Sequence, residues 1–199
     1  MIGVGGIGSG TFFALNGDHT LGREESRSGR FLDRRDYCKL HIIAHYIQTL
    51  LGPDFITLPI GKVGDDEAGR KVLEEMRQSG MDLRYVEVVA GEQTMYSICF
   101  VYPDGTGGNL TTEDSANARV TPDFVAAAKV DFAAWQGRGI ALAAPEVSLE
   151  SRLMLLQSGA QHDFYRVLAI NSTEARSPLI TTMLEETDFL ALNLDEAAA

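Results

Sequence analysis

The stretch 60–80, IGKVGDDEAGRKVLEEMRQSG, constrains the fold more than any other part of this chain. Its first two glycines permit backbone conformations closed to residues with a Cβ, so a strand end and a tight turn are expected there. Asp65 or Asp66 can then cap the first free amides of a helix. This helix is expected to stop at Gly80. Its apolar side predicts burial against a sheet, and consists of Ala68, Val72, Leu73 and Met76.

The order strand, helix, strand repeats along the rest of the chain, which predicts an α/β fold with parallel pairing and right-handed crossovers. A further helix is expected where Thr121 precedes Pro122, because threonine caps helices and proline suits their first position. The other helices are predicted at 37–51 and 148–158. Strands are predicted at 55–60, 85–90, 94–102, 109–112, 139–144, 166–170 and 189–192.

Length and charge restrict the possible partners. A chain of 199 residues can bury one sizeable core, and its net charge of -11 disfavours nucleic acid and anionic membrane surfaces. Cys38 and Cys99 lie far apart in unrelated contexts, so neither a disulfide framework nor a cysteine zinc site is indicated and a reducing cytoplasm fits. No segment reaches 18 uninterrupted apolar residues, and nothing marks secretion or membrane insertion.

Two short patterns carry functional alternatives of low specificity. Residues 3–8 satisfy the dinucleotide pattern G-x-G-x-x-G, which makes a nicotinamide-dependent oxidoreductase a distant alternative. Only two residues precede Gly3, so a glycine-rich first strand over 1–16 is favoured over a nucleotide loop. His41 and His45 have the spacing of a helical zinc pair, but no third ligand is evident and a polar helix face is favoured.

Several motifs together resemble the ribokinase-like (PfkB) family of carbohydrate and nucleoside kinases. They are V-G-x-D-x-x-G at 63–69, D-S-A-N at 114–117 and N-L-D-E-A at 193–197. The resemblance covers residues 1–199 and implies a single, incomplete ribokinase-like domain. It implies a mostly parallel sheet with flanking helices and a small β lid from about 9–36 and 94–112. A solvated loop is an equal alternative for 17–36, because this segment is polar and lacks a clean period.

The resemblance implies ATP-dependent phosphoryl transfer to a hydroxyl of a sugar or nucleoside, with Mg²⁺. Asn193 and Glu196 match the family residues that help place magnesium and phosphate, with Glu196 toward the metal, and Asn171 is expected beside them. A carboxylate that acts through water suits magnesium, which keeps most of its own water. The lid is a possible contact with a second copy of the chain. The substrate side is expected to involve Asp36, Lys39, Thr94 and Glu146.

The chain departs from the family pattern at the substrate side. Gly10 falls near the usual position of an aspartate that holds the sugar, and Ser115 replaces a glycine. Asp36 and Lys39 stand where the family has G-G-x-x-x-N, so they can make polar contacts but do not identify the acceptor. Because Glu146 and Asn193 each directly follow a predicted parallel strand, the site residues are expected at one edge of the sheet.

The family motif D-T-x-G-A-G-D is not among these 199 residues. In the family it supplies an anion hole and the catalytic base, and the adenine pocket follows it. The sequence therefore predicts a truncated form of a kinase, with the base outside this chain. The alternative is a non-catalytic ligand-binding or dimerisation module.

Overall fold

The computed structural model describes residues 1–199 and contains two separate sheets. The larger has six strands in the order β10-β9-β8-β1-β4-β5, and every neighbouring pair is parallel. This arrangement confirms the predicted mostly parallel α/β fold. The strands of this sheet are β1 (Ile2–Val4), β4 (Leu58–Gly64), β5 (Tyr85–Val89), β8 (Ile140–Ala143), β9 (Tyr165–Ala169) and β10 (Phe189–Ala191).

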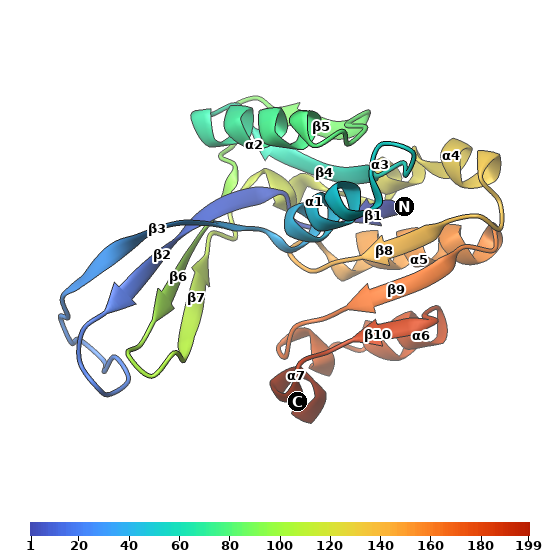
Figure 1. Ribbon diagram of the computed structural model, residues 1–199. Coiled ribbons are helices and arrows are strands. Elements are labelled where there is room, and N and C mark those ends of the chain that lie inside the picture. The colour runs from blue at the N-terminus through green and yellow to red at the C-terminus, as the bar shows by residue number, and fades with distance from the viewer.

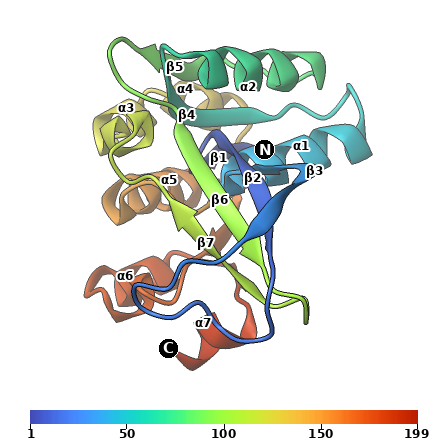
Figure 2. The same ribbon diagram turned by 90° about the vertical axis from the view of Figure 1, so that its left-hand side faces the viewer.

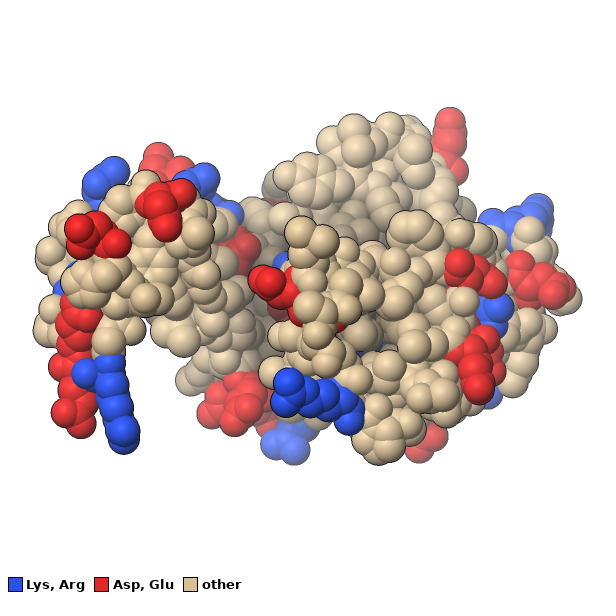
Figure 3. Space-filling model, turned by 90° about the horizontal axis from the view of Figure 1, so that it is seen from below, with Lys and Arg blue, Asp and Glu red and all other residues tan.

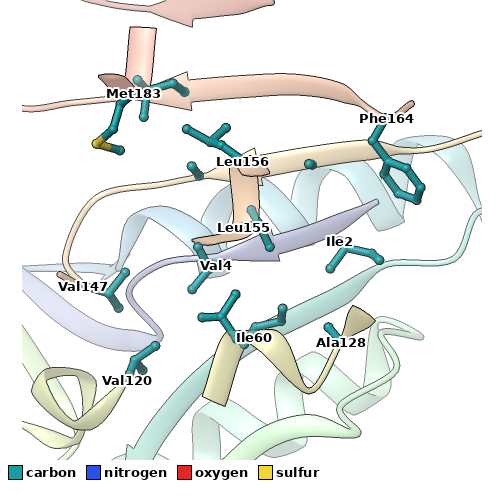
Figure 4. Close-up of a cluster of buried hydrophobic side chains, with 14 of the residues drawn as sticks. Ile2, Val4, Ile60, Val120, Ala128, Val147, Leu155, Leu156, Phe164 and Met183 are labelled. Atoms are coloured by element: carbon teal, nitrogen blue, oxygen red, sulfur yellow. The ribbon is translucent and has the colours of Figure 1, made fainter. Parts of the chain in front are cut away.

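Helices cover both faces of this sheet (Figure 1). One face packs on α1 (Lys39–Leu51) and α2 (Glu67–Gln78), which bury Leu40, Val72 and Met76 against β1 and β4. The other face carries the larger core cluster, in which Leu155 lies beside Val4 and Leu156 lies toward Met183 (Figure 4). That face is covered by α3 (Pro122–Ala126), α4 (Lys129–Ala134), α5 (Leu149–Gln161) and α6 (Leu179–Glu185).

The second sheet projects from the body as a lid (Figures 1 and 2). Its strand order is β3-β2-β6-β7, with β2 parallel to β6 and antiparallel pairing elsewhere. The strands lie at the segments expected for the lid. Residues 17–28 form a mostly exposed loop without helix or strand, so the loop alternative holds for the first part of 17–36 and the lid for the rest. Their bounds are β2 (Gly8–Leu15), β3 (Gly29–Tyr37), β6 (Met95–Val101) and β7 (Gly107–Thr111).

The βα unit at 60–80 forms with one correction. Asp66 caps α2 by accepting a hydrogen bond from the Gly69 amide, and Gly80 adopts a φ of 93° after the helix ends, as expected. However, β4 continues to Gly64, so Gly61 lies inside a strand rather than in a tight turn. Lack of a side chain at position 61 matters because the Ile7 side chain packs against that position.

Two further boundaries differ from expectation near the lid. The predicted single strand over 1–16 is two strands, β1 in the main sheet and β2 in the lid, with the chain crossing between sheets at Gly5 and Gly6. The helix expected from Tyr37 begins at Lys39, because Tyr37 still pairs with Ser9 in the lid. Sequence periodicity does not report which sheet a strand joins.

Helix burial also differs from the sequence pattern. His41 and Gln48, expected on a polar face of α1, are buried. The helix expected to end near Ser158 continues to Gln161, so Gly159 lies inside it. The absence of a side chain at Gly159 lets the helix pack closely on β8, because a Cβ there would meet the Ala141 side chain at 2.9 Å. These cases show tertiary packing overriding local polarity and glycine content.

Acidic and basic side chains intermingle on the face drawn in Figure 3, and no broad basic patch occurs on that face. None of the helices combines the length and the apolar character needed to cross a membrane.

Candidate functional site

The predicted site residues follow the carboxyl ends of parallel strands, which meet at one edge of the main sheet. Glu146 follows β8, Asn171 follows β9 and Asn193 follows β10, while Thr94 comes after β5 at the start of the lid. Ligands of open parallel sheets bind at this edge. The fold thus brings these side chains to one side, and their roles toward a ligand remain predictions.

Glu146 is held in a strained position against the start of α1. Its φ is 78°, a left-handed conformation that is unusual for glutamate, and its Oε2 accepts a hydrogen bond from the Lys39 amide at 2.9 Å. Gly6 makes room, because a Cβ there would meet Glu146 Oε2 at 2.2 Å. Burial raises the pKa of the Glu146 carboxyl, and the charge of Asp36 raises it further against the lowering effect of Lys39.

Asp36 reaches across the lid because Gly10 lacks a side chain. One cross-strand row of the lid places Asp36 beside Gly10 and Gly10 beside Ser97. Across that gap Ser97 Oγ donates to Asp36 Oδ2 at 2.7 Å, and Cys99 Sγ donates to the same oxygen at 3.0 Å. Burial, followed by the Asp36 carboxylate, raises the pKa of Cys99 to about 12, so this thiol stays a neutral donor. The second Asp36 oxygen has no partner in the chain.

Lys39 is exposed, with its backbone amide bound to Glu146. Its side chain therefore stays available at the junction between lid and body.

Thr94 is buried and its hydroxyl is fully used inside the protein. Thr94 Oγ1 donates to Asp66 Oδ1 at 2.6 Å and accepts from the Gly64 amide at 2.9 Å. The Thr94 amide donates to Asp66 Oδ2 at 2.8 Å. These contacts join the end of β4, the start of α2 and the start of β6. The structure shows Thr94 in these internal hydrogen bonds, and a contact between Thr94 and a substrate stays a prediction.

Asn193 and Glu196 form a reciprocal capping box at the start of α7 (Leu194–Ala198). The backbone N–H of Asn193 donates to Glu196 Oε2, and the backbone N–H of Glu196 donates to Asn193 Oδ1, both at 2.8 Å. Glu196 Oε1 has no partner in the chain, so it can take a hydrated cation without breaking the box. One carboxylate with water fits magnesium, and no cluster of three or more His, Cys, Asp or Glu offers a protein cage.

Asn171 lies in a second box of the same form. Its backbone N–H donates to Glu174 Oε2, and its Oδ1 accepts from the backbone N–H of Glu174, both at 3.0 Å. The sequence interpretation missed Glu174 and its buried partner Arg152. The signal was present, because N-x-x-E occurs at 171–174 as well as at 193–196 and each copy follows a strand.

The dinucleotide alternative loses its structural basis. Gly8 opens the lid strand β2 rather than a helix, whereas the fingerprint needs a helix that begins at the glycines. The His41 and His45 rings lie with centroids 6.1 Å apart, but His41 is buried and its Nδ1 lies 3.4 Å from the Gly8 carbonyl.

A cavity of about 550 Å³ lies between α2 and the lid, and neither Asp36 nor Glu146 lines it. Arg35 and Glu75 form an ion pair across it, and Tyr37 donates to Glu75 at 3.0 Å. We assign the site to the sheet edge instead, since Arg35 pairs with Glu75 and Lys71 with Glu67 in this cavity.

Comparison with known proteins decides the family. The family model described as pfkB family carbohydrate kinase matches residues 43–199, more than half of the chain. The chain belongs to the pfkB family of carbohydrate kinases. No curated protein matches the sequence.

Solved structures confirm the ribokinase-like fold of this pfkB chain. Ribokinase from Giardia lamblia superposes with a TM-score of 0.76 at 19% identity, with 98% of this chain and 58% of that chain covered. Arabidopsis thaliana ribokinase complexed with ribose and ATP gives 0.67 at 17% identity, with 99% and 61% covered.

Burkholderia thailandensis nucleoside kinase in complex with inosine gives a TM-score of 0.64 at 16% identity, with 100% and 62% covered. At such identities the likeness establishes the fold. The pfkB chain spans less than two thirds of the length of each of these three neighbours.

Proposed function

We propose that this pfkB chain carries the acceptor-binding part of an ATP-dependent kinase that phosphorylates a hydroxyl of a sugar or nucleoside. The family match supports the kinase class. The structural neighbours include one complexed with ribose and ATP and one with inosine, which supports these acceptor and donor classes. The two free cysteines fit a cytoplasmic location.

The observation that carries this proposal is the placement of Asp36 and Glu146 at the junction of lid and body. Glu146 binds the Lys39 backbone amide, three residues after Asp36 near the end of the lid strand β3, and the charge of Asp36 raises the pKa of Glu146. Carboxylates accept hydrogen bonds strongly and are suited to neighbouring hydroxyls of a sugar. Gly6 and Gly10 leave the space that the side chains of Glu146 and Asp36 occupy, and Lys39 stands beside them.

The phosphate side would lie at the ends of β9 and β10. Glu196 would hold a hydrated Mg²⁺ through its free Oε1, with Asn193 and Asn171 beside it. Bound magnesium would neutralise charge on the ATP phosphates. The residues of this chain would orient the nucleotide there, while no residue present matches the family base or anion hole.

The lid offers a surface for a second copy. Register places Leu110 opposite Ile98, and Phe31 opposite Phe13, on the lid face away from Asp36. Phe31 is 67% exposed and Leu110 is 64% exposed. A contiguous apolar face of this kind suits a self-complementary contact, so we propose a homodimer through the lid.

A non-catalytic ligand-binding module is the second candidate. Such a module would keep the acids Asp36 and Glu146 of the acceptor side and bind a small ligand there. Binding without turnover is its expected behaviour.

Acceptor binding is tested by calorimetric titration of the chain with pentoses, hexoses and nucleosides. Loss of a hydrogen bond to a charged group costs about 1.5–3 kcal/mol, so Asp36→Asn and Glu146→Gln should each weaken binding roughly 10- to 100-fold. Asp33→Asn, an exposed acid on the same strand β3, is the matched control and should bind as wild type. Binding that survives both site variants would refute this location.

A further inference from the structure

Two reciprocal boxes of identical sequence form stand side by side at the site edge. Asn171 and Glu174 follow β9, and Asn193 and Glu196 follow the adjacent parallel strand β10. In each box the backbone N–H of the asparagine donates to the glutamate carboxylate, at 3.0 Å and 2.8 Å. By their own backbone contacts alone, the two glutamates would be equally available to a ligand.

A buried arginine distinguishes the two boxes. Arg152, on α5, has no exposed surface, and its Nη1 donates to Glu174 Oε1 at 2.8 Å. Its Nη2 donates to the carbonyl of Ala169, the last residue of β9. Both oxygens of Glu174 are therefore occupied, Oε1 by Arg152 and Oε2 by the Asn171 amide. Glu196 keeps Oε1 free.

Burial makes the Arg152–Glu174 contact obligatory rather than optional. A guanidinium removed from water is tolerated only when a partner charge and hydrogen bonds compensate it. Burial lowers the pKa of Arg152, and Glu174 counteracts this. Arg152 Nε has no hydrogen-bond partner in the chain. Glu174 is the only acid that forms an ion pair with Arg152, and therefore supplies the only compensating charge. Turning Glu174 toward a ligand would strand the buried cation.

We propose that Arg152 is a positioning residue that locks Glu174 and the loop at the end of β9, so that a cation at this edge is drawn to Glu196 alone. The position of Asn171 beside that cation is then fixed. Glu174 does not contact the ligand, and affects it only by holding the loop that carries Asn171. This inference rests on the proposed magnesium and ATP site.

The first test measures Mn²⁺ bound by the 199-residue chain, with free Mn²⁺ followed by electron paramagnetic resonance. Glu196→Gln should weaken Mn²⁺ binding at least about tenfold, the usual range for residues that tune a metal site. In the wild-type background Glu174→Gln, which acts only through the loop, should weaken Mn²⁺ binding far less than Glu196→Gln does. In the Arg152→Met background, where Glu174 is released, it should weaken binding about as much as Glu196→Gln. Glu185→Gln, an exposed acid on α6, controls for loss of one negative charge. Equal losses from Glu174→Gln and Glu196→Gln in otherwise wild-type chain would overturn the lock.

The second test follows hydrogen exchange of the Asn171 and Asn193 amides by NMR. Arg152→Met should speed Asn171 exchange at least about tenfold by freeing the box, and leave Asn193 unchanged. Arg152→Lys keeps the cation and should restore most of the protection at Asn171. Unchanged Asn171 exchange in the methionine variant, or a lysine variant as fast as methionine, would overturn the proposal.

The two tests distinguish a failure of the proposed role of Arg152 from a failure of the proposed magnesium and ATP site. If Glu196→Gln leaves Mn²⁺ binding intact, the metal site fails, whereas Asn171 exchange still decides the role of Arg152. Should Arg152→Met not unfold cooperatively, the lysine variant and Glu174→Gln in the wild-type background decide the proposal.

Discussion

At the scale of single residues, two positions without a side chain shape the candidate site. Gly10 lets Asp36 reach Ser97 over the strand between them, and Gly6 leaves space for Glu146. The family aspartate expected near position 10 is absent, and an acid from the neighbouring strand stands across from it. A carboxylate is thus present on this lid face, but from β3 instead of β2.

His41 gives a prediction for pH dependence. Burial lowers its pKa from 6.5 to about 4, partly offset by the Gly8 carbonyl. Between these values the unfolded chain binds more protons than the folded chain, so stability falls as pH drops through this window. From pH 7 to pH 5, His41 should cost about 2 kcal/mol of unfolding free energy. Urea unfolding of His41→Leu should show a correspondingly smaller loss between the two pH values, and an equal loss in both proteins would contradict it.

At the scale of elements, Asp66 joins three of them. It caps α2 through Gly69 and accepts two hydrogen bonds from Thr94 at the start of the lid strand β6. Burial raises the pKa of Asp66, but these hydrogen bonds outweigh it and hold the value below 3.8. The contact network therefore stabilises the fold above the ordinary aspartate pKa and is lost as pH falls through the lower folded value.

We predict that Asp66→Ala lowers the unfolding free energy by about 2–4 kcal/mol, because a cap is lost and the buried donors of Thr94 are left unpaired. Denaturant unfolding at pH 7 measures the change. Asp65→Ala, next in the chain and exposed, should change stability by less than about 0.5 kcal/mol. Similar losses in both variants would show that the Asp66 contacts contribute little.

At the scale of the whole molecule, lid and body meet at the site but carry separate surfaces. If the apolar lid face binds a second copy, a charge placed on it should dissociate the dimer. Leu110→Lys should shift the chain to monomer in sedimentation velocity. Asn109→Lys, on the opposite face of the same strand, should leave the dimer intact. A wild-type chain that is monomeric at all concentrations would rule out this interface.

Phosphoryl transfer gives the last prediction. One missing oxyanion donor can cost about 10²–10³ in rate, and a general base contributes roughly another 10²–10⁴. The 199 residues contain neither family element. The purified chain should therefore show no ATP turnover across sugars and nucleosides, even where it binds them. Turnover that depends on substrate and falls in Glu196→Ala would show that the residues present assemble catalysis.

The sequence by itself determined the α/β class, the βα unit with its aspartate cap and the edge at which polar residues gather. These follow from periodicity and from the geometry of parallel strands, both of which are local or topological rules. It also identified the family, through motifs that keep their spacing.

Only the tertiary structure decided which side chains meet. It divided residues 1–16 between two sheets, buried His41 and occupied the Thr94 hydroxyl with Asp66. It also paired Arg152 with Glu174, which are 22 positions apart. Such contacts depend on how separate elements pack, and the energy of burying a charge or hydroxyl is set by neighbours that no local pattern specifies.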